Sequence, residues 1–418
     1  MRTGITPAEA LRAILDETPV LAAETVAARE ALGRVLAAPV DSPRTLPPAD
    51  NSAMDGYAVR LDDLASASEG SPAVLRVAFE VAAGGEASVA LGPGQAARVL
   101  TGAPVPPGAD AVVRQEDTER EGDRLTVLAA PGPREHIRDA GEDVRIGDRV
   151  LEPGAVLGPS ELGLLASLGR GMVAVHQRPR VAILSGGDEL VEPDGDVAGG
   201  RIVSSNSYSI AAQCRALGAD PVYLGIARDT RDDVERHFRA GLRADVLVSS
   251  AGVSVGDHDH VRPVLEELGC RLAFWGVQMK PGYPLAFGRF EGESGPLVFG
   301  LPGNPVSAMV TFEEFVRPAL RRMMGHRGLF RPLVRARLGE TLRKKAGRLH
   351  FVRVSLARED GAVVAHSTGN QSSGVLRSMT LAAGLLIFPA EATELAAGAE
   401  ADVQVLDPDF LASDRPGF

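Results

Sequence analysis

Acidic side chains follow three of the apolar segments in this chain, each where a strand-like run breaks into polar residues. The set is Glu189, Asp229, Asp257 and Asp259. Because the carboxyl ends of parallel strands lie at one edge of a sheet, we expect these carboxylates to lie close together. Oxygen ligands of this kind suit Mg²⁺ that bridges a phosphate. A single acid in a loop is more often a helix cap or part of a solvated turn. The prediction therefore depends on acids occurring at the corresponding ends of three strands.

The most informative stretch covers residues 245–260, where an apolar run gives way to hydroxyls, glycines and acids. Glycines at 252 and 256 let a phosphate or an oxyanion approach the backbone, since no Cβ stands in the way. His258 and His260 flank Asp259, and such a pair also suits a transition metal. No third His or Cys ligand is near in the sequence, and the many acids favour a hard cation. The acids Asp257 and Asp259 are therefore better candidates for metal ligands than the two histidines.

A second group of residues could bind an oxyanion. The segment at 296–307 reads as a strand followed by a helix, with Asn304 as the cap and Pro305 in the first turn. The amide end of a helix carries about half a positive charge, so Ser307 and the neighbouring N–H groups can form an anion pocket. Lys280 lies on a Gly/Pro turn and could place a cation there, although a lone lysine is usually a surface residue.

The elements that must position these side chains alternate between short strands and amphipathic helices. Strands are expected near 181–184, 221–226 and 246–249, and helices near 207–217, 232–240 and 261–268. This alternation is typical of a doubly wound parallel sheet. Short β-type runs between 75 and 127 indicate a small β-rich domain, and the β-type runs beyond residue 328 indicate a C-terminal β-barrel or sandwich.

Length and composition narrow the class of protein. A chain of 418 residues with 44% hydrophobic and 24% charged residues is expected to form two to four globular domains. It has no apolar run of the roughly 20 residues that a bilayer span needs, and its N-terminus lacks the apolar core of a secretion signal, so we expect a cytoplasmic protein. The net charge of −11 argues against a nucleic-acid partner. Cys214 and Cys270 lack the spacing of zinc ligands.

Six motifs along the chain resemble, in the same order, those of the MoeA-type molybdopterin molybdenumtransferases, which include the C-terminal domain of gephyrin. They are NSAMDGYAV (51–59), TGAPVP (101–106), GEDV (141–144), GDEL (187–190), GVSVG (252–256) and GLPGNPVS (300–307). No P-loop, GxGxxG or GxSxG motif competes with this interpretation.

The resemblance implies a multidomain α/β fold with four domains. Residues 1–45 and 145–177 would form an elongated helical linker domain, and residues 46–144 an inserted β-rich domain. Residues 178–327 would form the doubly wound molybdopterin-binding α/β domain, and residues 328–418 the C-terminal β-barrel. A homodimer with the site between the subunits is also implied.

The implied reaction is the Mg²⁺-dependent insertion of molybdate into adenylylated molybdopterin, with release of AMP. The implied partners are these two substrates, a second copy of the chain, and a downstream molybdoenzyme or a molybdopterin adenylyltransferase. No membrane partner is expected.

Site residues follow from the matching positions. The metal and adenylate-phosphate ligands would be Glu189 and Asp259. The acidic catalytic residues would be Asp55, Asp143 and Asp229, and the basic one Arg138. The backbone approach to the substrate would use Gly252, Ser254 and Gly256. The molybdate pocket would consist of Lys280, Ser307, Arg353 and Ser373, whose cations and hydroxyls match a tetrahedral oxyanion.

The chain departs from the family pattern at three positions. Tyr283 replaces the second lysine of a Lys-Pro-Gly-Lys-Pro motif, Gly276 stands where a lysine often follows the Phe-Trp pair, and Ala251 replaces a glycine. Each desolvated charge-assisted hydrogen bond contributes on the order of 1.5–3 kcal/mol, so the loss of two ammonium groups weakens oxyanion binding. A tungstate-inserting paralogue, a non-catalytic scaffold for pterin, nucleotide or protein, and a generic nucleotide-binding α/β enzyme stay open as alternatives.

Overall fold

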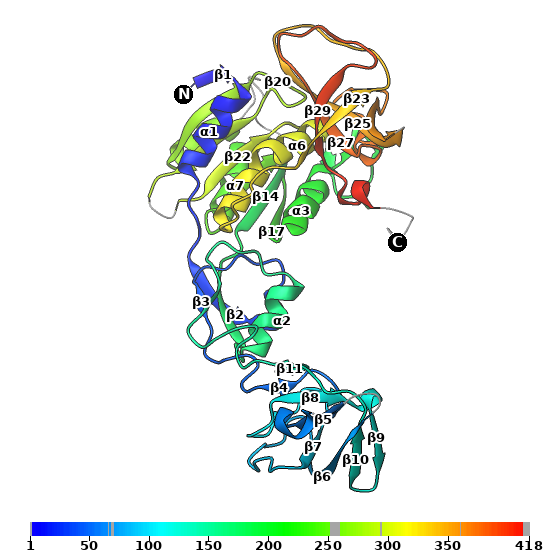
Figure 1. The fold of residues 1–418 in the computed structure, drawn as a ribbon. Coiled ribbons are helices and arrows are strands. Elements are labelled where there is room, and N and C mark those ends of the chain that lie inside the picture. Colours follow the sequence, from blue (N-terminus) through cyan, green and yellow to red (C-terminus); the bar gives the residue numbers. More distant parts are fainter. Residues whose placement is uncertain are drawn as a thin grey trace. The chain divides into compact units, whose positions relative to one another are not determined.

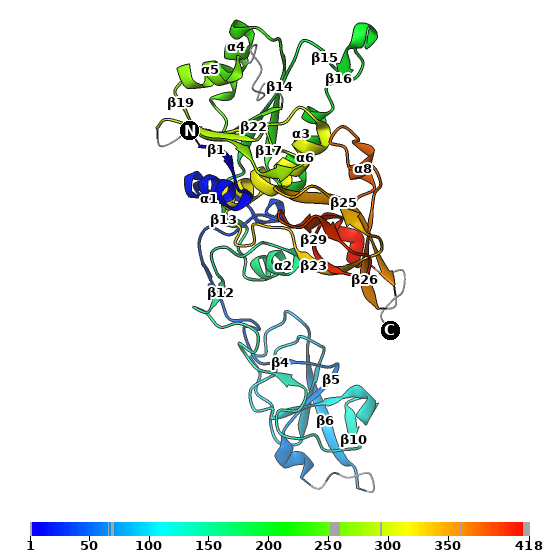
Figure 2. The ribbon, with the colours of Figure 1, turned by 90° about the horizontal axis from the view of Figure 1, so that it is seen from above.

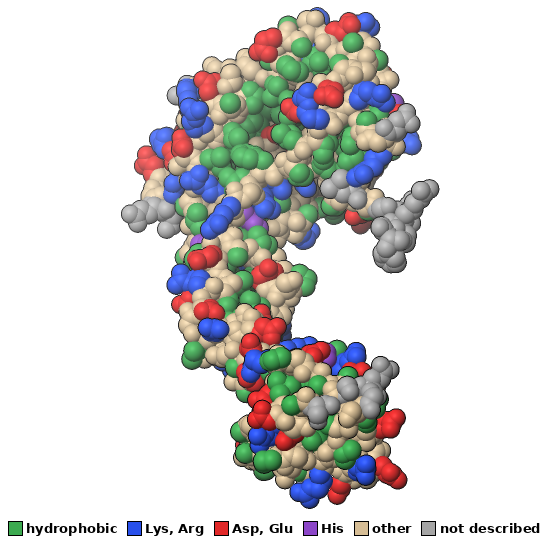
Figure 3. Space-filling model, viewed as in Figure 1, with side chains coloured by type: hydrophobic (Ala, Val, Ile, Leu, Met, Phe, Trp, Pro, Cys, Tyr) green, Lys and Arg blue, Asp and Glu red, His purple; other side chains and the backbone are tan. Residues whose placement is uncertain are grey.

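A computed structural model describes residues 2–65, 67, 71–250, 260–292, 295–359 and 361–412. The chain forms two compact units. The first consists of Met1–Ala37, Gly154–Gly158 and Val173–Phe418, and the second of Ala38–Pro153 and Pro159–Met172. Within the described ranges, no helix has both the length and the apolar character needed to cross a membrane. On the face shown in Figure 3, basic and acidic side chains are interspersed.

A mixed sheet, seven-stranded in the described residues, forms the centre of the first unit (Figure 1). Its strands in spatial order are β1 (Arg2–Ile5), β19 (Cys270–Val277), β21 (Ala286–Phe290), β22 (Leu297–Leu301), β18 (Val246–Ser250), β14 (Arg180–Gly186) and β17 (Asp220–Ala227). The strands from β22 to β17 are parallel to one another. Strand β21 is antiparallel to both neighbours, because no crossover helix separates it from β19. The sequence pattern predicted a parallel sheet and missed this antiparallel part.

Helices cover both faces of the sheet, which confirms the doubly wound arrangement (Figure 2). One face packs against α1 (Pro7–Glu17), α3 (Asn206–Leu217), α6 (Pro305–Thr311) and α7 (Arg317–Met323), and the other against α4 (Arg231–Gly241) and α5 (Val261–Glu267). Side chains alternate along β14: Val181 and Ile183 enter the first core, and Ala182 and Leu184 enter the second. A strand buried on both faces therefore reads as a continuous apolar run.

The ends of two helices can be compared with their sequence signals. Thr6 and Glu9 form the expected capping box at the start of α1: Glu9 N–H donates to Thr6 Oγ1 at 3.3 Å and Thr6 N–H to Glu9 Oε2 at 2.8 Å. Asn304 is the N-cap of α6 with Pro305 in the first turn, as predicted. The side chain of Asn304 makes no capping hydrogen bond, so only part of that expectation is met.

The C-terminal region is a closed five-stranded β-barrel, as predicted, in the described part of the chain. Its strands follow one another around the barrel in the order β25 (Leu349–Glu359), β26 (Ala362–Ser367), β23 (Leu333–Leu338), β29 (Glu400–Val405) and β27 (Gly384–Phe388), which pairs again with β25. Strand β20 (Met279–Lys280) adds to β25 in parallel. The chain that links β19 to β21 therefore contacts the barrel.

The second unit contains a β-rich domain. Its six-stranded sheet in the described residues has the order β8 (Ala111–Arg114), β5 (Gly56–Val59), β7 (Gln95–Val99), β6 (Ala73–Val81), β10 (Arg124–Val127) and β9 (Thr118–Glu121). Gly56 is required where β5 meets β8, because a Cβ there would collide with the carbonyl oxygen of Val113. This contact gives a physical reason for the glycine in the NSAMDGYAV motif.

The four domain boundaries predicted from the sequence stay predictions. Segments 1–45 and 145–177, expected to be helical, hold α1 and α2 (Pro159–Ser167) together with several short strands. The strands are β1, β2 (Ala23–Ala27), β3 (Val40–Asp41), β12 (Arg149–Leu151) and β13 (Met172–His176). Within these segments, β1 and α1 belong to the large sheet and its core.

Candidate functional site

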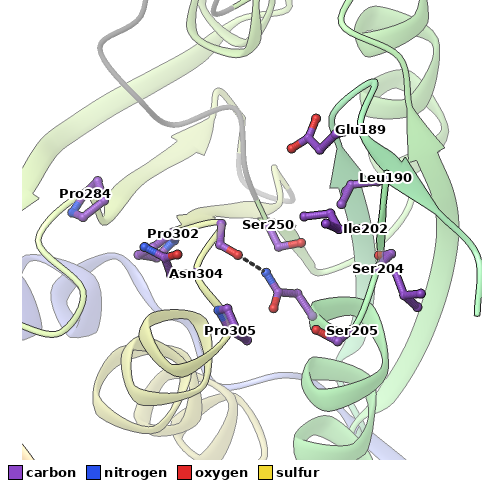
Figure 4. A pocket seen from close by; sticks show the side chains of 13 residues that line it. Glu189, Leu190, Ile202, Ser204, Ser205, Ser250, Pro284, Pro302, Asn304 and Pro305 are labelled. Atoms are coloured by element: carbon purple, nitrogen blue, oxygen red, sulfur yellow. Dashed lines mark hydrogen bonds between the residues drawn. The ribbon is translucent and has the colours of Figure 1, made fainter. Parts of the chain in front are cut away.

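A cavity of about 520 Å³ lies at the carboxyl end of β14, β18 and β22 (Figure 4). Its walls come from the loops after these strands and from the starts of α3 and α6. The lining residues are Glu189, Leu190, Ile202, Val203, Ser204, Ser205, Asn206, Ser250, Pro284, Pro302, Gly303, Asn304 and Pro305. This is the edge of an open α/β sheet at which ligands bind, so the cavity is the candidate site.

Two buried oxygens in this cavity wall lack a partner. Asn206 donates from Nδ2 to the carbonyl oxygen of Gly303 at 2.8 Å, which fixes its amide. Its Oδ1 and the Oγ of Ser250 are buried, and neither has a hydrogen-bond partner in the described residues. Because an unpaired buried oxygen costs about 1–3 kcal/mol, each atom calls for a partner that the described residues do not supply.

Glu189 lies in the wall of the cavity, as the sequence predicted for a ligand-binding acid. Its carboxylate folds back over Gly187, where a Cβ would lie 2.5 Å from Oε2. Gly187 has φ = 138°, a conformation that also favours glycine. The Gly-Asp-Glu sequence therefore brings the carboxylate to the end of β14.

Asp229 has a different environment from Glu189. Asp188 N–H donates to Asp229 Oδ2 and Asp229 N–H to Asp188 Oδ1, both at 3.2 Å. These bonds join the loops after β14 and β17, and Asp229 is not among the residues that line the cavity. The structure thus brings Asp229 to the predicted sheet edge, next to Asp188.

The predicted residues Gly252, Ser254, Gly256 and Asp259 lie outside the described residues, as does Asp257. They follow Ser250 in the sequence, and Ser250 ends β18 in the cavity wall. No cluster of three or more His, Cys, Asp or Glu side chains suited to a metal occurs in the part of the chain that the structure describes.

Lys280, Arg353 and a buried histidine come together where β20 meets β25. Lys280 pairs in register with His350, and its side chain is exposed. His350 is buried, and neither ring nitrogen has a hydrogen-bond partner in the described residues. Burial and the nearby Lys280 cation lower the pKa of His350 to about 4, so the imidazole is neutral at pH 7.

Arg353 is fully buried and is held by hydrogen bonds from two of its guanidinium nitrogens. Nε donates to Ser378 Oγ at 3.2 Å, and Nη2 donates to the carbonyl oxygen of Ser372 at 3.2 Å. Nη1 is buried without a partner among the described atoms, and burial lowers the pKa of Arg353 to about 10. The guanidinium remains charged at pH 7 and keeps one unpaired donor group.

The segments that contain Ser307 and Ser373 are joined by a backbone hydrogen bond. Val306 N–H donates to the carbonyl oxygen of Ser373 at 3.1 Å. This bond joins the first turn of α6 to the barrel loop whose Ser372 carbonyl accepts a hydrogen bond from Arg353. Because Asn304 and Pro305 line the cavity, Ser307 and the Ser373 backbone lie near its α6 wall.

The remaining predicted residues lie in the second unit. Asp55 Oδ1 accepts hydrogen bonds from the N–H of Thr101 at 2.7 Å and from its hydroxyl at 2.9 Å, and these bonds lower the pKa of Asp55. Arg138 is exposed on β11 (Ile137–Arg138), which pairs with β4 (Asn51–Ser52). Asp143 is exposed, and its N–H donates to the carbonyl oxygen of Leu46. The NSAMDGYAV motif and Arg138 therefore lie side by side.

Three residues described above were not predicted: Asn206, Ser250 and His350. The polar run from Ser204 to Ser207 at the start of α3 was a signal for Asn206, because it contains more residues of the capping type than one helix end uses. Nothing in the sequence marked His350, because a histidine within an apolar strand is usually a core residue. Its importance comes from the pairing of β20 with β25.

Together, these features define a multidomain α/β protein with a cavity at the carboxyl edge of its sheet, lined by Glu189, Asn206 and Ser250. Three family models match the chain: the MoeA N-terminal region (domain I and II) at residues 5–169, the probable molybdopterin binding domain at 182–322, and the MoeA C-terminal region (domain IV) at 335–406.

Curated relatives match over most of the chain. A molybdopterin molybdenumtransferase of Nostoc sp. is 39% identical over 377 residues, which cover 90% of this chain and 86% of that protein. Molybdopterin molybdenumtransferase 2 of Mycobacterium tuberculosis is 39% identical over 388 residues, covering 91% and 94%. A solved structure of the molybdopterin biosynthesis MoeA protein from Pyrococcus horikoshii has 32% identity and a TM-score of 0.83, with 96% and 99% covered. The chain belongs to the MoeA family of molybdopterin molybdenumtransferases.

Proposed function

We propose that this enzyme inserts molybdate into adenylylated molybdopterin in a Mg²⁺-dependent reaction that releases AMP and yields Mo-molybdopterin. The observation that carries the proposal is the first turn of α6. Asn304 and Pro305 line the cavity at the sheet edge, and Val306 N–H donates to the carbonyl of Ser373. The preceding residue, Ser372, accepts a hydrogen bond from the Arg353 guanidinium through its carbonyl. A pterin–nucleotide site and an oxyanion site would thus share one helix end.

The residues at the cavity fit a magnesium ion. Glu189 supplies a carboxylate, and the unpaired buried oxygens of Asn206 and Ser250 supply neutral donors of the type that Mg²⁺ accepts. Glu189 and Asp259 would hold the ion, with Asp259 assigned from the motif alone. When bound, Mg²⁺ would neutralise charge on the adenylate phosphate during cleavage.

The oxyanion would be bound by the residues around β25 and α6. Arg353 Nη1 offers a charged donor, Lys280 a second cation, and Ser307 and Ser373 hydroxyls. Burial makes the Arg353 contact strong, because the guanidinium exchanges no competing hydrogen bonds with water. This arrangement would hold the dianion in position for transfer to the dithiolene.

Asp55, Asp143, Asp229 and Arg138 keep their proposed catalytic roles, and Gly252, Ser254 and Gly256 their proposed contact with the substrate. Of these, Asp55 is supported by its low pKa, which keeps it ionised, and Asp229 by its place at the sheet edge. We further propose a cytoplasmic homodimer, which sedimentation would test, and exchange of the pterin with an adenylyltransferase or a molybdoenzyme.

A tungstate-inserting enzyme is the second candidate. The departure from the family pattern at Tyr283 supports it, since a side chain without charge stands where the family pattern has a lysine. A non-catalytic scaffold would retain the cavity and need no oxyanion donors.

Turnover distinguishes these candidates. Purified protein would be incubated with adenylylated molybdopterin, Mg²⁺, and molybdate or tungstate, and metallated pterin would be measured. We expect metallation, its loss in Asp259→Ala and Lys280→Ala, and normal turnover in Lys345→Ala, which removes an exposed lysine. Tight pterin binding without metallation by either oxyanion would refute the insertase proposal.

A further inference from the structure

A second cavity, of about 410 Å³, lies elsewhere in the first unit and shares no lining residue with the candidate site. It is formed by the chain around residues 32–35, by β13, and by the C-terminal ends of α3 and α7. The lining residues are Leu32, Gly33, Arg34, Val35, Val156, His176, Arg178, Arg215, Ala216, Leu217, Gly218, Arg321, Met324 and His326. Its volume falls in the range of small-molecule sites.

The charged lining of this cavity is entirely basic. Four arginines and two histidines line it, and no lining residue is acidic. Arg34 is paired with Glu24 and with the carbonyl oxygen of His176, and Arg321 donates from Nε to the carbonyl oxygen of Gly328 at 2.6 Å. These two side chains are thereby held in place at the wall.

The other two arginines are available to a ligand. Arg178 and Arg215 are exposed, and neither guanidinium makes a hydrogen bond or ion pair with another described residue. His326 has a buried Nδ1 without a partner among the described atoms. Burial and then Arg321 lower the pKa of His326 to about 4, so its neutral ring adds no repulsion to the cluster at pH 7.

Part of this basic lining has a structural explanation. Arg215 and Arg321 lie in the last turns of α3 and α7, where a cation favours the helix dipole by about 0.3–1 kcal/mol. This explanation does not extend to Arg178, which precedes β14, or to the unpaired nitrogen of His326. It also leaves the cavity itself unexplained.

The uncharged part of the lining is apolar. Leu32 and Val156 are 60% and 48% exposed, and Leu217 and Met324 complete the same wall. A ligand with a flat or apolar body and an anionic end would pack against these side chains and place its anionic group beside the arginines. Guanidinium groups bind phosphate in a bidentate manner, so phosphate is the anion that this lining suits.

We propose that this cavity is a second binding site that takes an organic phosphate of nucleoside-diphosphate size. Arg178 and Arg215 bind the phosphates, and the apolar wall holds the base. The inference does not depend on the proposed reaction, because no residue of that site contributes to it.

Photolabelling of the full-length protein with 8-azido-ADP, followed by peptide mapping, tests the proposal. We expect label on peptides that contain Ala216–Leu217 or Met324, displaced by ADP at lower concentration than by pyrophosphate. Adenosine should not displace it. In Arg178→Ala/Arg215→Ala, at least tenfold more probe should be needed for the same label, with an unchanged thermal midpoint.

The control variant Arg236→Ala/Arg262→Ala removes two exposed arginines from α4 and α5 on the other face of the sheet. It should label like the wild type. Label confined to peptides of the first cavity, equal labelling of both double variants, or displacement by adenosine as effective as by ADP would overturn the proposal. Loss of label with a lowered midpoint would be resolved by Arg178→Lys/Arg215→Lys, which should recover labelling if charge is the cause and fail to if it is not.

Discussion

The ring of Tyr283 lies directly against Gly276: a Cβ on Gly276 would be 3.4 Å from Cζ of Tyr283. Gly276 has φ = 88°, so a lysine there would be strained as well as crowded. The guanidinium of Arg348 lies over the ring of Tyr283, 4.5 Å from its centre. The two departures from the family pattern are therefore one packing feature, and Arg348 keeps a cation at this place.

Tyr283→Lys is expected to tighten molybdate binding by about tenfold, which corresponds to roughly 1.4 kcal/mol from one added charge-assisted contact. Calorimetric titration with molybdate measures the change. Leu333→Lys, at an exposed apolar residue of β23, is the control and should leave the affinity unchanged. Unchanged affinity in Tyr283→Lys would show that Arg348 already supplies the missing charge.

Ser373→Ala is expected to weaken molybdate binding, because its hydroxyl belongs to the proposed oxyanion pocket. Ser372→Ala is the matched control, since Ser372 contacts Arg353 through its carbonyl oxygen, which alanine retains. We expect a KM for molybdate several-fold higher in Ser373→Ala only. Equal effects of the two substitutions would indicate that the loop conformation matters and the hydroxyl does not.

Arg353→Lys keeps the charge and loses the planar fork that donates to Ser378 and Ser372. We expect molybdate affinity to fall by at least about tenfold, since charged hydrogen bonds contribute about 1.5–3 kcal/mol. Arg358→Lys, later on the same strand, should bind normally. If Arg353→Lys binds molybdate as well as the wild type, the guanidinium is not an oxyanion donor.

Glu314 gives the protein a predictable pH dependence. Burial raises the pKa of this carboxyl to about 7 from 4.5. The folded chain therefore keeps a proton that the unfolded chain releases, so the free energy of unfolding should fall as pH rises from about 4.5 through 7. We expect the free energy of unfolding, measured by chemical denaturation, to fall by roughly 3 kcal/mol over this window, since one pKa unit corresponds to about 1.4 kcal/mol.

Glu314→Gln can still accept the hydrogen bond that Gln404 Nε2 donates at 3.0 Å, and it should flatten the pH profile. Glu266→Gln changes a half-exposed carboxylate of α5 and should retain the wild-type slope of unfolding free energy against pH. A profile with the same slope in Glu314→Gln would assign the pH dependence to other groups.

Much of the fold could be predicted from local patterns. The apolar runs of β14 and β18 and the capping box of Thr6 and Glu9 are local signals, and each forms the expected element. The antiparallel β21 was missed because its direction depends on how the chain returns from β19, which no local pattern encodes.

The site was predictable where it follows a strand end. Glu189 lines the cavity as expected, because a glycine turn after β14 leaves little choice for its position. The position of His350 could not be predicted, since it arises when β20 meets the barrel and residues distant in sequence become neighbours. The Tyr283–Gly276 contact is local, and it depends on how the chain folds back after β20.

The coupling between AMP release and metal incorporation tests the central claim most directly. Purified protein in excess over adenylylated molybdopterin would receive Mg²⁺ and molybdate, and AMP and molybdenum-containing pterin would be followed together. The account predicts that both products form in equal amounts and at the same rate. Release of AMP without molybdenum in the pterin, or bound pterin that releases no AMP, would contradict it.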